Sequence, residues 1–501
     1  MGNVCKYLCS PFEDPAHLAS FACDEITDLE HEDDARQEEV LVSKRKQSLL
    51  TIDHDTRSYL DPFHTYPSRL SRETITRILH YSIREMWPKL FPGMKYKGKT
   101  FTHEWMKSCL NCPPLFSAWL HSGAEHIIIR ERASGVQTST PKDKYELLLM
   151  RQEAIVGLRK AVDDGSPTMI TDQIVMAAFA IALHPHERDK VQPSRTKMAP
   201  LSNLQLLTRF TDIVIIDGHV RGLRHLVQAR GGFEQLQMPG LREGLSSWDL
   251  VVASKTLTRP FWPLQTRLEL DSAAAFLASF EHSNVETRNL HVVLYSKISQ
   301  PMIWVFHSLR GYSALLEGYA DGRLVVLDLG YTLQLRNLIH YHVMTISSAI
   351  SVEIESVSYI YEPFRLALII YSLLVVFPVS LTTSPYESLA CLLQDELELV
   401  PDEEWASMPS LLIWILTLGG IAALDTPHRL WFVERLHFEL RKLNIGSWQK
   451  FLHIMDTYLW LETPCGIEGM IVWKEARQYG HQPLVEDHIA RGSVFDIPVR
   501  D

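Results

Sequence analysis

The sequence is poor in the features of a secreted or nucleic-acid-binding chain. Its 501 residues contain seven cysteines; this odd, scattered set excludes a disulfide framework and favours a reducing compartment. Basic residues are in the minority, since 49 lysines and arginines stand against 60 aspartates and glutamates, giving a net charge of -11. That sign opposes attraction of the whole molecule to phosphates. Any contact with nucleic acid would therefore have to be local.

Long apolar runs are also missing. The two longest, Leu366–Val379 and Leu411–Leu424, span about 14 residues each, whereas a membrane-spanning helix needs roughly 20. We predict that both are buried helices and that the chain has no membrane partner. The N-terminus lacks the apolar stretch of a signal peptide, and Lys6 stands where a myristoylation signal has serine or threonine. We therefore expect neither export nor a lipid anchor.

Residues 1–58 are predicted to form a disordered acidic segment, because a stretch with so few aromatic residues buries too little surface to fold. It is typical of a solvated leader, and an acidic interaction tail is the alternative. The basic trio Lys44-Arg45-Lys46 has fewer charges than most nuclear localisation elements, so it is interpreted as a solvated turn. The acidic residues are Asp24, Glu25, Asp28, Glu30, Glu32, Asp33, Asp34, Glu38 and Glu39.

From Asp61 onward, apolar residues recur every three or four positions, which predicts amphipathic helices. The first helix follows Ser71, a residue type that caps helix N-termini, and Trp87-Pro88 is expected to end it. Segment Ile174–Leu183 is apolar on almost every side, as in a helix at the centre of a helical body. Further apolar faces are predicted at Tyr145, Leu148, Leu149, Ile155, Leu158 and Val162; at Leu335, Leu338, Ile339, Val343, Ile346 and Ile350; at Leu430, Val433, Leu436, Leu440 and Leu443; and at Trp448, Phe451, Leu452, Met455, Leu459 and Trp460.

These patterns predict an all-α fold, a large multi-helix bundle with antiparallel helix pairs. No sustained two-residue alternation with hairpin signals is visible, and Asp217-Gly218 lies between helical stretches. The proline-rich stretches at 185–200 and 378–385 are expected to be loops between helices. One helical domain at 59–480, followed by a C-terminal tail at 481–501, is the simplest organisation.

One segment satisfies the phosphate-binding pattern of P-loop enzymes, Gly93-Met94-Lys95-Tyr96-Lys97-Gly98-Lys99-Thr100. In such a site Lys99 would contact phosphate and Thr100 would contact magnesium. The context argues against it, because the pattern must follow a buried strand and open a helix, whereas here a predicted helix precedes it. We interpret the segment as a lysine-rich surface loop and keep a nucleotide-binding enzyme as an alternative.

Metal ligation has equally little support. Cys109 and Cys112 have zinc-ligand spacing, but no second pair follows, and His121 and His126 lie in a predicted packed helix. His184-Pro185-His186 and His340-Tyr341-His342 would point to different helix faces, so they are interpreted as structural or surface histidines.

Signature motifs of hydrolases, metalloproteases and dinucleotide-binding enzymes are absent from the sequence. We predict that the chain is not an enzyme. We assign no catalytic, cofactor-binding or metal-ligating residues and no cofactor.

Several short phrases nevertheless occur in a characteristic order over roughly 400 residues. The most specific is His219–Gly232, which ends in Arg230-Gly231-Gly232; its glycines are expected to stop a helix, Gly222 to allow close helix packing, and Leu223, Leu226 and Val227 to form its apolar face. In this order the chain resembles the fungal-specific transcription factor domain, the regulatory body of binuclear zinc-cluster activators. The other phrases are Asp61-Pro62-Phe63, Tyr66-Pro67, Glu362–Ala367, Leu411–Trp414 through Gly419-Gly420, Arg429–Val433, Trp448 and Leu459-Trp460.

The family's zinc cluster is missing from this sequence. It requires six cysteines before Asp61, where Cys5, Cys9 and Cys23 stand among acidic residues. None of the family's DNA-contacting or zinc-binding residues can be carried over, which puts direct DNA binding in doubt. We therefore keep three alternatives open. A partner supplies DNA binding, DNA binding was lost from this chain, or an upstream exon is missing from the sequence.

The resemblance implies a transcriptional regulator in the nucleus, whose partners are the transcription machinery or a DNA-binding protein. Two alternatives stay open, a P-loop enzyme using Gly93–Thr100 and a helical interaction scaffold outside the nucleus. No heptad run long enough for a coiled-coil dimer is visible, so the sequence leaves the oligomeric state undefined.

Overall fold

The computed structural model describes residues 66–479, with the exception of 94, 97–98, 136–139, 164–169, 184–197, 212, 281–291, 325–326, 349–357 and 382–384. The acidic segment 1–58, the basic trio Lys44-Arg45-Lys46 and the tail 481–501 lie outside the described residues. The same is true of both expected domain boundaries, which stay predictions.

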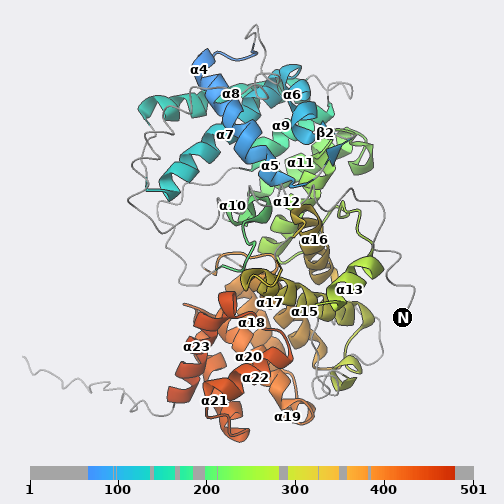
Figure 1. Cartoon of the computed structure of the whole chain (residues 1–501), viewed down its shortest axis with the longest axis vertical. Helices are drawn as coiled ribbons and strands as arrows, with labels where there is room; N and C mark the ends of the chain where they lie inside the picture. Colours follow the sequence, from blue (N-terminus) through green and yellow to red (C-terminus); the bar gives the residue numbers. More distant parts are fainter. Residues whose placement is uncertain are drawn as a thin grey trace, which may run out of the picture.

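The fold is all-α, as the helical periodicity predicts, and the described parts of the chain form a large bundle of helices (Figure 1). Among the described residues the strands are two segments of two residues each, β1 (Lys95–Tyr96) and β2 (Lys99–Thr100), which pair with each other. None of the described helices is both long and apolar enough to cross a membrane.

Buried hydrophobic residues divide the molecule into two lobes, which Figure 1 shows above and below the level of α12 and α16. The N-terminal lobe surrounds a core between Leu70 and Trp262. Its elements are α4 (Arg72–Tyr81), the π-helical turn η1 (Ser82–Met86), α5 (Trp87–Leu90), β1, β2, α6 (Phe101–Leu110), α7 (Pro113–Ala133), α8 (Pro141–Asp163), α9 (Asp172–Ala182), η3 (Leu204–Leu206), α10 (Leu207–Thr211), α11 (Asp217–Ala229) and η4 (Phe233–Gln235).

The C-terminal lobe surrounds a second core that extends to Ala476. Helix α12 (Leu241–Thr256) connects the lobes, because Leu245 and Trp248 belong to the first core and Ala253 to the second. The remaining helices are α13 (Leu270–Ala278), α15 (Gln300–Ala320), α16 (Leu329–Thr345), α17 (Tyr361–Val375), α18 (Tyr386–Glu398), α19 (Asp402–Trp405), α20 (Pro409–Ala422), α21 (Arg429–Lys442), α22 (Trp448–Thr457) and α23 (Glu462–Gln478).

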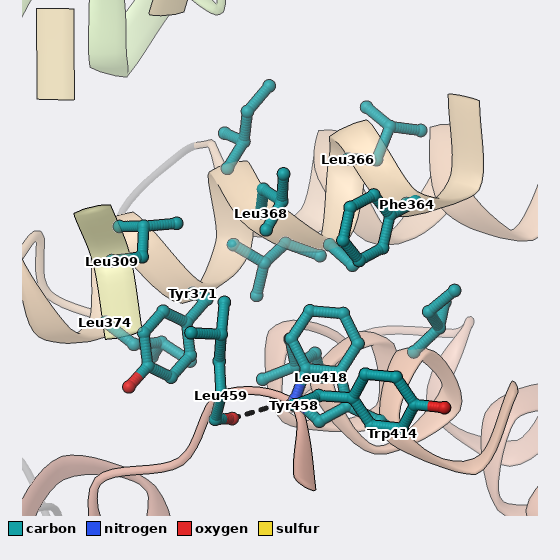
Figure 2. Packing of buried hydrophobic residues seen from close by; sticks show 14 of the residues in the cluster. Leu309, Phe364, Leu366, Leu368, Tyr371, Leu374, Trp414, Leu418, Tyr458 and Leu459 are labelled. Atoms are coloured by element: carbon teal, nitrogen blue, oxygen red, sulfur yellow. Dashed lines mark hydrogen bonds between the residues drawn. The ribbon is translucent and has the colours of Figure 1, made fainter. Parts of the chain in front are cut away.

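The two most apolar sequence runs form buried helices, as predicted, and these helices lie in the core of the C-terminal lobe. They become α17 and α20, and α20 packs against α17, α18, α21, α22 and α23. Trp414 is fully buried there and donates a 2.8 Å hydrogen bond from its indole nitrogen to the carbonyl oxygen of Leu459, drawn in Figure 2 beside Tyr458 and Phe364. Because every buried polar group needs a partner, this bond fixes the segment after α22 against α20.

The first helix begins as predicted and ends later than predicted. The hydroxyl of Ser71 accepts a hydrogen bond from the backbone N–H of Thr74, which caps α4. Trp87-Pro88 does not end the helix, because the chain continues through η1 into α5. The N–H of Trp87 bonds to the carbonyl of Ser82 in a π turn, and Pro88 then occupies the first turn of α5, where a missing N–H costs little.

Helix α8 shows that the predicted apolar face was partly wrong. Tyr145 and Leu148 are 66% and 63% exposed, whereas the residues that face the body are Met150 and Ala154, both buried. The small side chain of Ala154 and the absence of one at Gly157, whose Cβ would lie 2.5 Å from Pro114, let α8 approach α7 closely. The close approach of α7 therefore decides which face of α8 is buried, although another face carries larger apolar side chains.

The phrase at 219–232 forms α11 and its C-terminal stop. Gly231 and Gly232 have φ angles of 108° and 97°, which confirms the predicted glycine stop. Leu223 and Val227 face the core as expected. The role expected of Gly222 was wrong, because no atom lies within 4 Å of a Cβ added there. Close helix contact instead occurs at Gly419, whose Cβ would lie 2.2 Å from the ring of Phe432.

Gly419→Ala is expected to lower the free energy of unfolding by about 1–3 kcal/mol, because the buried ring of Phe432 cannot move away from the added methyl group. Gly222→Ala is the matched control, which should raise it by up to about 1 kcal/mol through helix propensity alone. Urea unfolding of the two variants measures both effects. Equal midpoints for Gly419→Ala and the unchanged protein would contradict this packing.

Candidate functional site

A pocket of about 110 Å³ lies where the N-terminal lobe meets α12 and the end of α17. It is surrounded mainly by aromatic and aliphatic side chains, with a few polar groups among them. The lining residues used below come from α5, α6, α7, α9, η3, α10, α12 and the loop after α17: Trp87, Trp105, Trp119, Glu125, His126, Phe179, Ala180, Gln205, Leu206, Arg209, Trp248 and Phe377.

Three tryptophans form one wall of the pocket. The ring of Trp119 lies 4.9 Å from those of Trp87 and Trp105, centroid to centroid. The indole nitrogen of Trp105 donates a 2.7 Å hydrogen bond to the carbonyl of Pro239, and Gly240 then begins α12 with a φ of 77°. A side chain at Gly240 would also meet the Trp105 ring at 3.0 Å. The wall is therefore fixed to the start of α12 and has little freedom to change shape.

Two polar groups of the pocket have unused donors. The indole nitrogen of Trp248 and one terminal nitrogen of Arg209 have no hydrogen-bond partner in the described part of the chain. Trp248 is only 5% exposed. Arg209 forms a 3.6 Å ion pair with Glu125, and burial lowers the pKa of Arg209. Unpaired buried donors cost free energy, and both atoms are enclosed by the surrounding side chains.

His126 is a neutral member of this wall. Burial, together with the nearby cations Arg209, Arg130 and Lys89, lowers its pKa to about 3. Its Nδ1 lies 2.5 Å from the hydroxyl of Tyr81, whose pKa is raised by burial. A neutral imidazole accepting from a protonated phenol is consistent with both shifts. His126 therefore supplies no charge to the pocket at neutral pH.

The floor of the pocket contains strained backbone. Gln205 and Leu206 are adjacent, buried and in the left-handed region, with φ angles of 64° and 56°. This conformation costs non-glycine residues about 1–2 kcal/mol each. Strain of this kind persists only where surrounding contacts impose it, and it is concentrated at binding and switch sites.

The contact that imposes it is made by Arg336, a fully buried residue of α16. Its guanidinium donates to the carbonyl of Leu204 at 2.6 Å, to Oε1 of Gln205 at 2.9 Å and to Oδ1 of Asn337 at 2.9 Å. The amide of Gln205 in turn donates to Ser247 of α12 at 3.2 Å. One cation thus holds η3, α12 and α16 together at the junction of the lobes.

His340, one turn along α16, completes the junction. Its ring stacks on Phe377 at 4.2 Å and 4°, and its nitrogens lie 2.7 Å from the hydroxyl of Ser254 and 2.9 Å from that of Ser372. Burial, followed by the charge of Arg336, lowers the pKa of His340 to about 3. The interpretation of His340 as a satisfied structural histidine is confirmed. His342 contacts Trp304, and His184-Pro185-His186 lies outside the described residues.

The segment Gly93–Thr100 is folded differently from a phosphate-binding loop. Gly93 makes a turn with a φ of 68° after α5, and Lys99 and Thr100 lie in β2, paired with Tyr96 and Lys95. In a P-loop this lysine and threonine begin a helix that follows a strand of a parallel sheet. The expected surface loop is thus a short antiparallel hairpin, which leads into α6.

The cysteine pair lies at the junction of α6 and α7. Cys109 is fully buried with its pKa raised by burial, and Cys112 precedes the first turn of α7. Across the described ranges, no three His, Cys, Asp or Glu side chains gather as a metal site would require. His121 is buried and contacts the carbonyl of Leu147, which confirms its interpretation as part of a packed helix.

The sequence analysis missed the residues of the pocket. Arg209 and Arg336 are single charges inside apolar stretches, Leu206–Phe210 and Leu333–Ile339, and such isolated charges in apolar helices were the available signal. The position of Arg336 behind the pocket depends on its bonds to Leu204 and Gln205, about 130 positions away in the chain, which no local pattern contains.

We compared the chain with known proteins by sequence and by structure. No protein-family model matches it, and neither the curated proteins nor the solved structures contain a significant match.

The stability of the protein is expected to fall as the pH is lowered from about 7 to about 5. The unfolded chain protonates His340 near its ordinary pKa of about 6.5, whereas the folded chain keeps it neutral down to about 3, so acid favours unfolding. For this one group the loss at pH 5 is about 2 kcal/mol. Urea unfolding of His340→Gln should show a smaller pH dependence. His225→Gln, on the exposed face of α11, is the control and should keep the original dependence.

Magnesium with ATP or GTP is expected to leave the thermal unfolding temperature unchanged, because Lys99 and Thr100 lie in a strand and not at a helix N-terminus. Lys99→Ala should behave like the unchanged protein. A magnesium-dependent stabilisation that disappears in Lys99→Ala would favour the nucleotide-binding alternative.

Proposed function

We propose that this chain is a transcriptional regulator of fungal type that acts in the nucleus through its helical body and lacks a zinc cluster of its own. Its partners are the transcription machinery or a DNA-binding protein that supplies promoter recognition. The chain is not an enzyme, and the pocket between its lobes serves for binding a small effector.

The main support is that the phrases shared with the fungal regulatory domain contact one another. Trp414, from one phrase, donates to the carbonyl of Leu459, from another. Gly419 gives room to the ring of Phe432, and Arg429 bonds to the carbonyl of Gly420. Residues that are distant in sequence and meet in one core belong to the framework of a single fold, as the residues of a common domain would.

The phrase that ends in Arg230-Gly231-Gly232 has a comparable framework role in the N-terminal lobe. Arg230 forms a 2.7 Å ion pair with Asp172 at the start of α9, and the glycines turn the chain back. The backbone N–H groups of Gln237 and Met238 then donate to the same carboxylate at 2.6 and 2.7 Å. The phrase therefore joins α11 to α9, the most buried helix of that lobe.

The pocket supports the regulatory part of the proposal. It is lined by the N-terminal lobe and α12, with Phe377 after α17 closing it, and it lies against strained backbone that Arg336 holds in place. A site that contacts both lobes can change their relative stability when it is occupied. This is the arrangement that a ligand-responsive regulator requires.

Chromatin association of the tagged full chain is the decisive measurement. We expect enrichment at a limited set of promoters, and we expect it to depend on a partner because this chain has no zinc cluster. Removal of residues 1–58 should lower reporter output while leaving chromatin association in place, if the acidic segment contacts the transcription machinery. A tagged protein found only in the cytoplasm under many growth conditions would contradict the proposal.

Reading the genomic DNA upstream of the first codon separates the two versions of the proposal. Six in-frame cysteines would mean that a zinc cluster belongs to the full protein. Their absence would mean that a partner provides DNA recognition.

A further inference from the structure

Helix α8 carries a stripe of exposed apolar side chains, on the side of the N-terminal lobe away from the C-terminal lobe (Figure 1). Tyr145, Leu148, Val156 and Val162 are between 47% and 66% exposed. At 3.6 residues per turn all four lie within about 120° of the helix circumference, opposite the buried Ala154. Single apolar residues are normal on a protein surface, but four on one side of one helix indicate an interaction surface.

The charges beside this stripe are almost all positive. Lys144, Arg159 and Lys160 are exposed and form no ion pair with the described residues, and the one exposed carboxylate on this side is that of Asp163, at the end of the helix. We call the stripe and these three basic residues the outer face of α8. The other carboxylates of α8 already have partners: Asp143 with Arg77, Glu146 with Thr74 and Lys142, and Glu153 with Ser68 and Ser117.

The chain itself contains a segment of complementary composition. Residues 24–42 hold nine aspartates and glutamates and a single arginine, in a protein whose net charge is -11. Opposite charge draws two surfaces together and selects between partners, whereas burial of apolar side chains supplies the stability of the contact. The segment offers both, because its apolar residues are Ile26, Leu29, Val40, Leu41 and Val42.

The described chain begins beside α8, which brings this segment within reach. The ring of Tyr66 stacks on that of Phe116 in α7 at 5.6 Å, and the hydroxyl of Ser68 donates a 3.3 Å hydrogen bond to Glu153, near the middle of α8. The chain between Val42 and Tyr66 spans up to about 80 Å when extended, and each half of α8 is only about 17 Å long. A tether of this length gives an effective concentration on the order of millimolar, so a weak contact is enough to keep the segment bound.

We propose that segment 24–42 of this chain binds the outer face of α8, with its apolar residues on the stripe and its carboxylates beside Lys144, Arg159 and Lys160. While it is bound there, the acidic segment is not available to other partners, and an acidic competitor for α8 releases it. The inference deepens the proposed function and rests on it for this consequence, since the contact controls when the acidic segment of the regulator reaches the transcription machinery.

Zero-length cross-linking of the purified full chain tests the contact, because a carbodiimide joins a lysine amine to a carboxylate only where the two touch. Mass spectrometry should find Lys144 and Lys160 joined to segment 24–42. Lys107, also exposed and on α6 of the same lobe, is the background lysine and should give at least about tenfold fewer cross-links. Absence of cross-links from Lys144 and Lys160, or equal yields at Lys107, overturns the inference.

Leu148→Ser tests the apolar stripe and leaves every charge in place. We expect the cross-links of Lys144 and Lys160 to fall about fivefold, because the segment loses a side chain to bury. Leu148 is 63% exposed, so its replacement should leave the unfolding temperature unchanged, which separates loss of the contact from misfolding. Leu399→Ser is the matched control, since Leu399 is 67% exposed but follows the carboxylates of Glu396 and Glu398 in the C-terminal lobe.

Leu399→Ser should keep the cross-links of the unchanged protein. Cross-links that persist in full in Leu148→Ser show that the stripe is not the docking surface and contradict the inference. In 1 M salt, where the screening length falls to about 3 Å, the cross-links of the unchanged protein should also decrease.

Two other occupants of the outer face are distinguished in the same preparation. A mixture of isotope-labelled and unlabelled chains should give cross-links within one isotope only, and mixed pairs mean that a second copy occupies α8, which contradicts the inference. An anionic membrane is the other occupant. Phosphatidylserine vesicles that bind the full chain and lose it in Leu148→Ser assign the face to lipid and overturn the inference.

These measurements use the purified chain and are independent of chromatin. Cross-links without chromatin association refute only the proposed function, and chromatin association without cross-links refutes only the inference.

Discussion

The buried guanidinium of Arg336 is the interaction on which the centre of the molecule depends. Removing a cation from water costs several kcal/mol even after the protein relaxes, and here neutral acceptors from η3 and α16 offset that cost. Because their geometry must satisfy the guanidinium, Gln205 and Leu206 are held in the left-handed region despite its cost. Burial, followed by the same charge, keeps the stacked imidazole of His340 neutral by lowering its pKa. Two lobes with separate hydrophobic cores are in this way joined by a polar contact.

This arrangement explains why the pocket lies where it does. Hydrophobic cores pack tightly and leave few voids, but at this edge the core of the N-terminal lobe meets a guanidinium, an ion pair and strained backbone. The result is an apolar space beside polar groups that are only partly satisfied. Such sites are a common setting for ligand binding, because a ligand supplies the missing partner. Location between lobes adds the property a regulator needs, a site whose occupancy affects both.

The helices were largely predictable, because the residues that begin, end and orient a helix lie close together in the sequence. The capping hydroxyl of Ser71, the glycine stop at Gly231 and the apolar runs that became α17 and α20 are all read within a few residues of chain. Where prediction failed, a contact between helices decided the outcome. At α8 the close approach to α7 buries Ala154 and leaves Tyr145 exposed. Before Pro88 a π turn lets the helix continue where proline alone would end it.

The sequence by itself determined the all-α class and most of the helices, since these depend on periodicity and on neighbours in the chain. Only the tertiary structure decided the candidate site. Glu125, Arg209 and Trp248 come from three helices, and Arg336, on a fourth, bonds to Gln205 of the same pocket lining. None of these residues stands out in the sequence. The effect of a charge or an N–H depends on its burial and on its hydrogen-bond partners, and both are set only by folding.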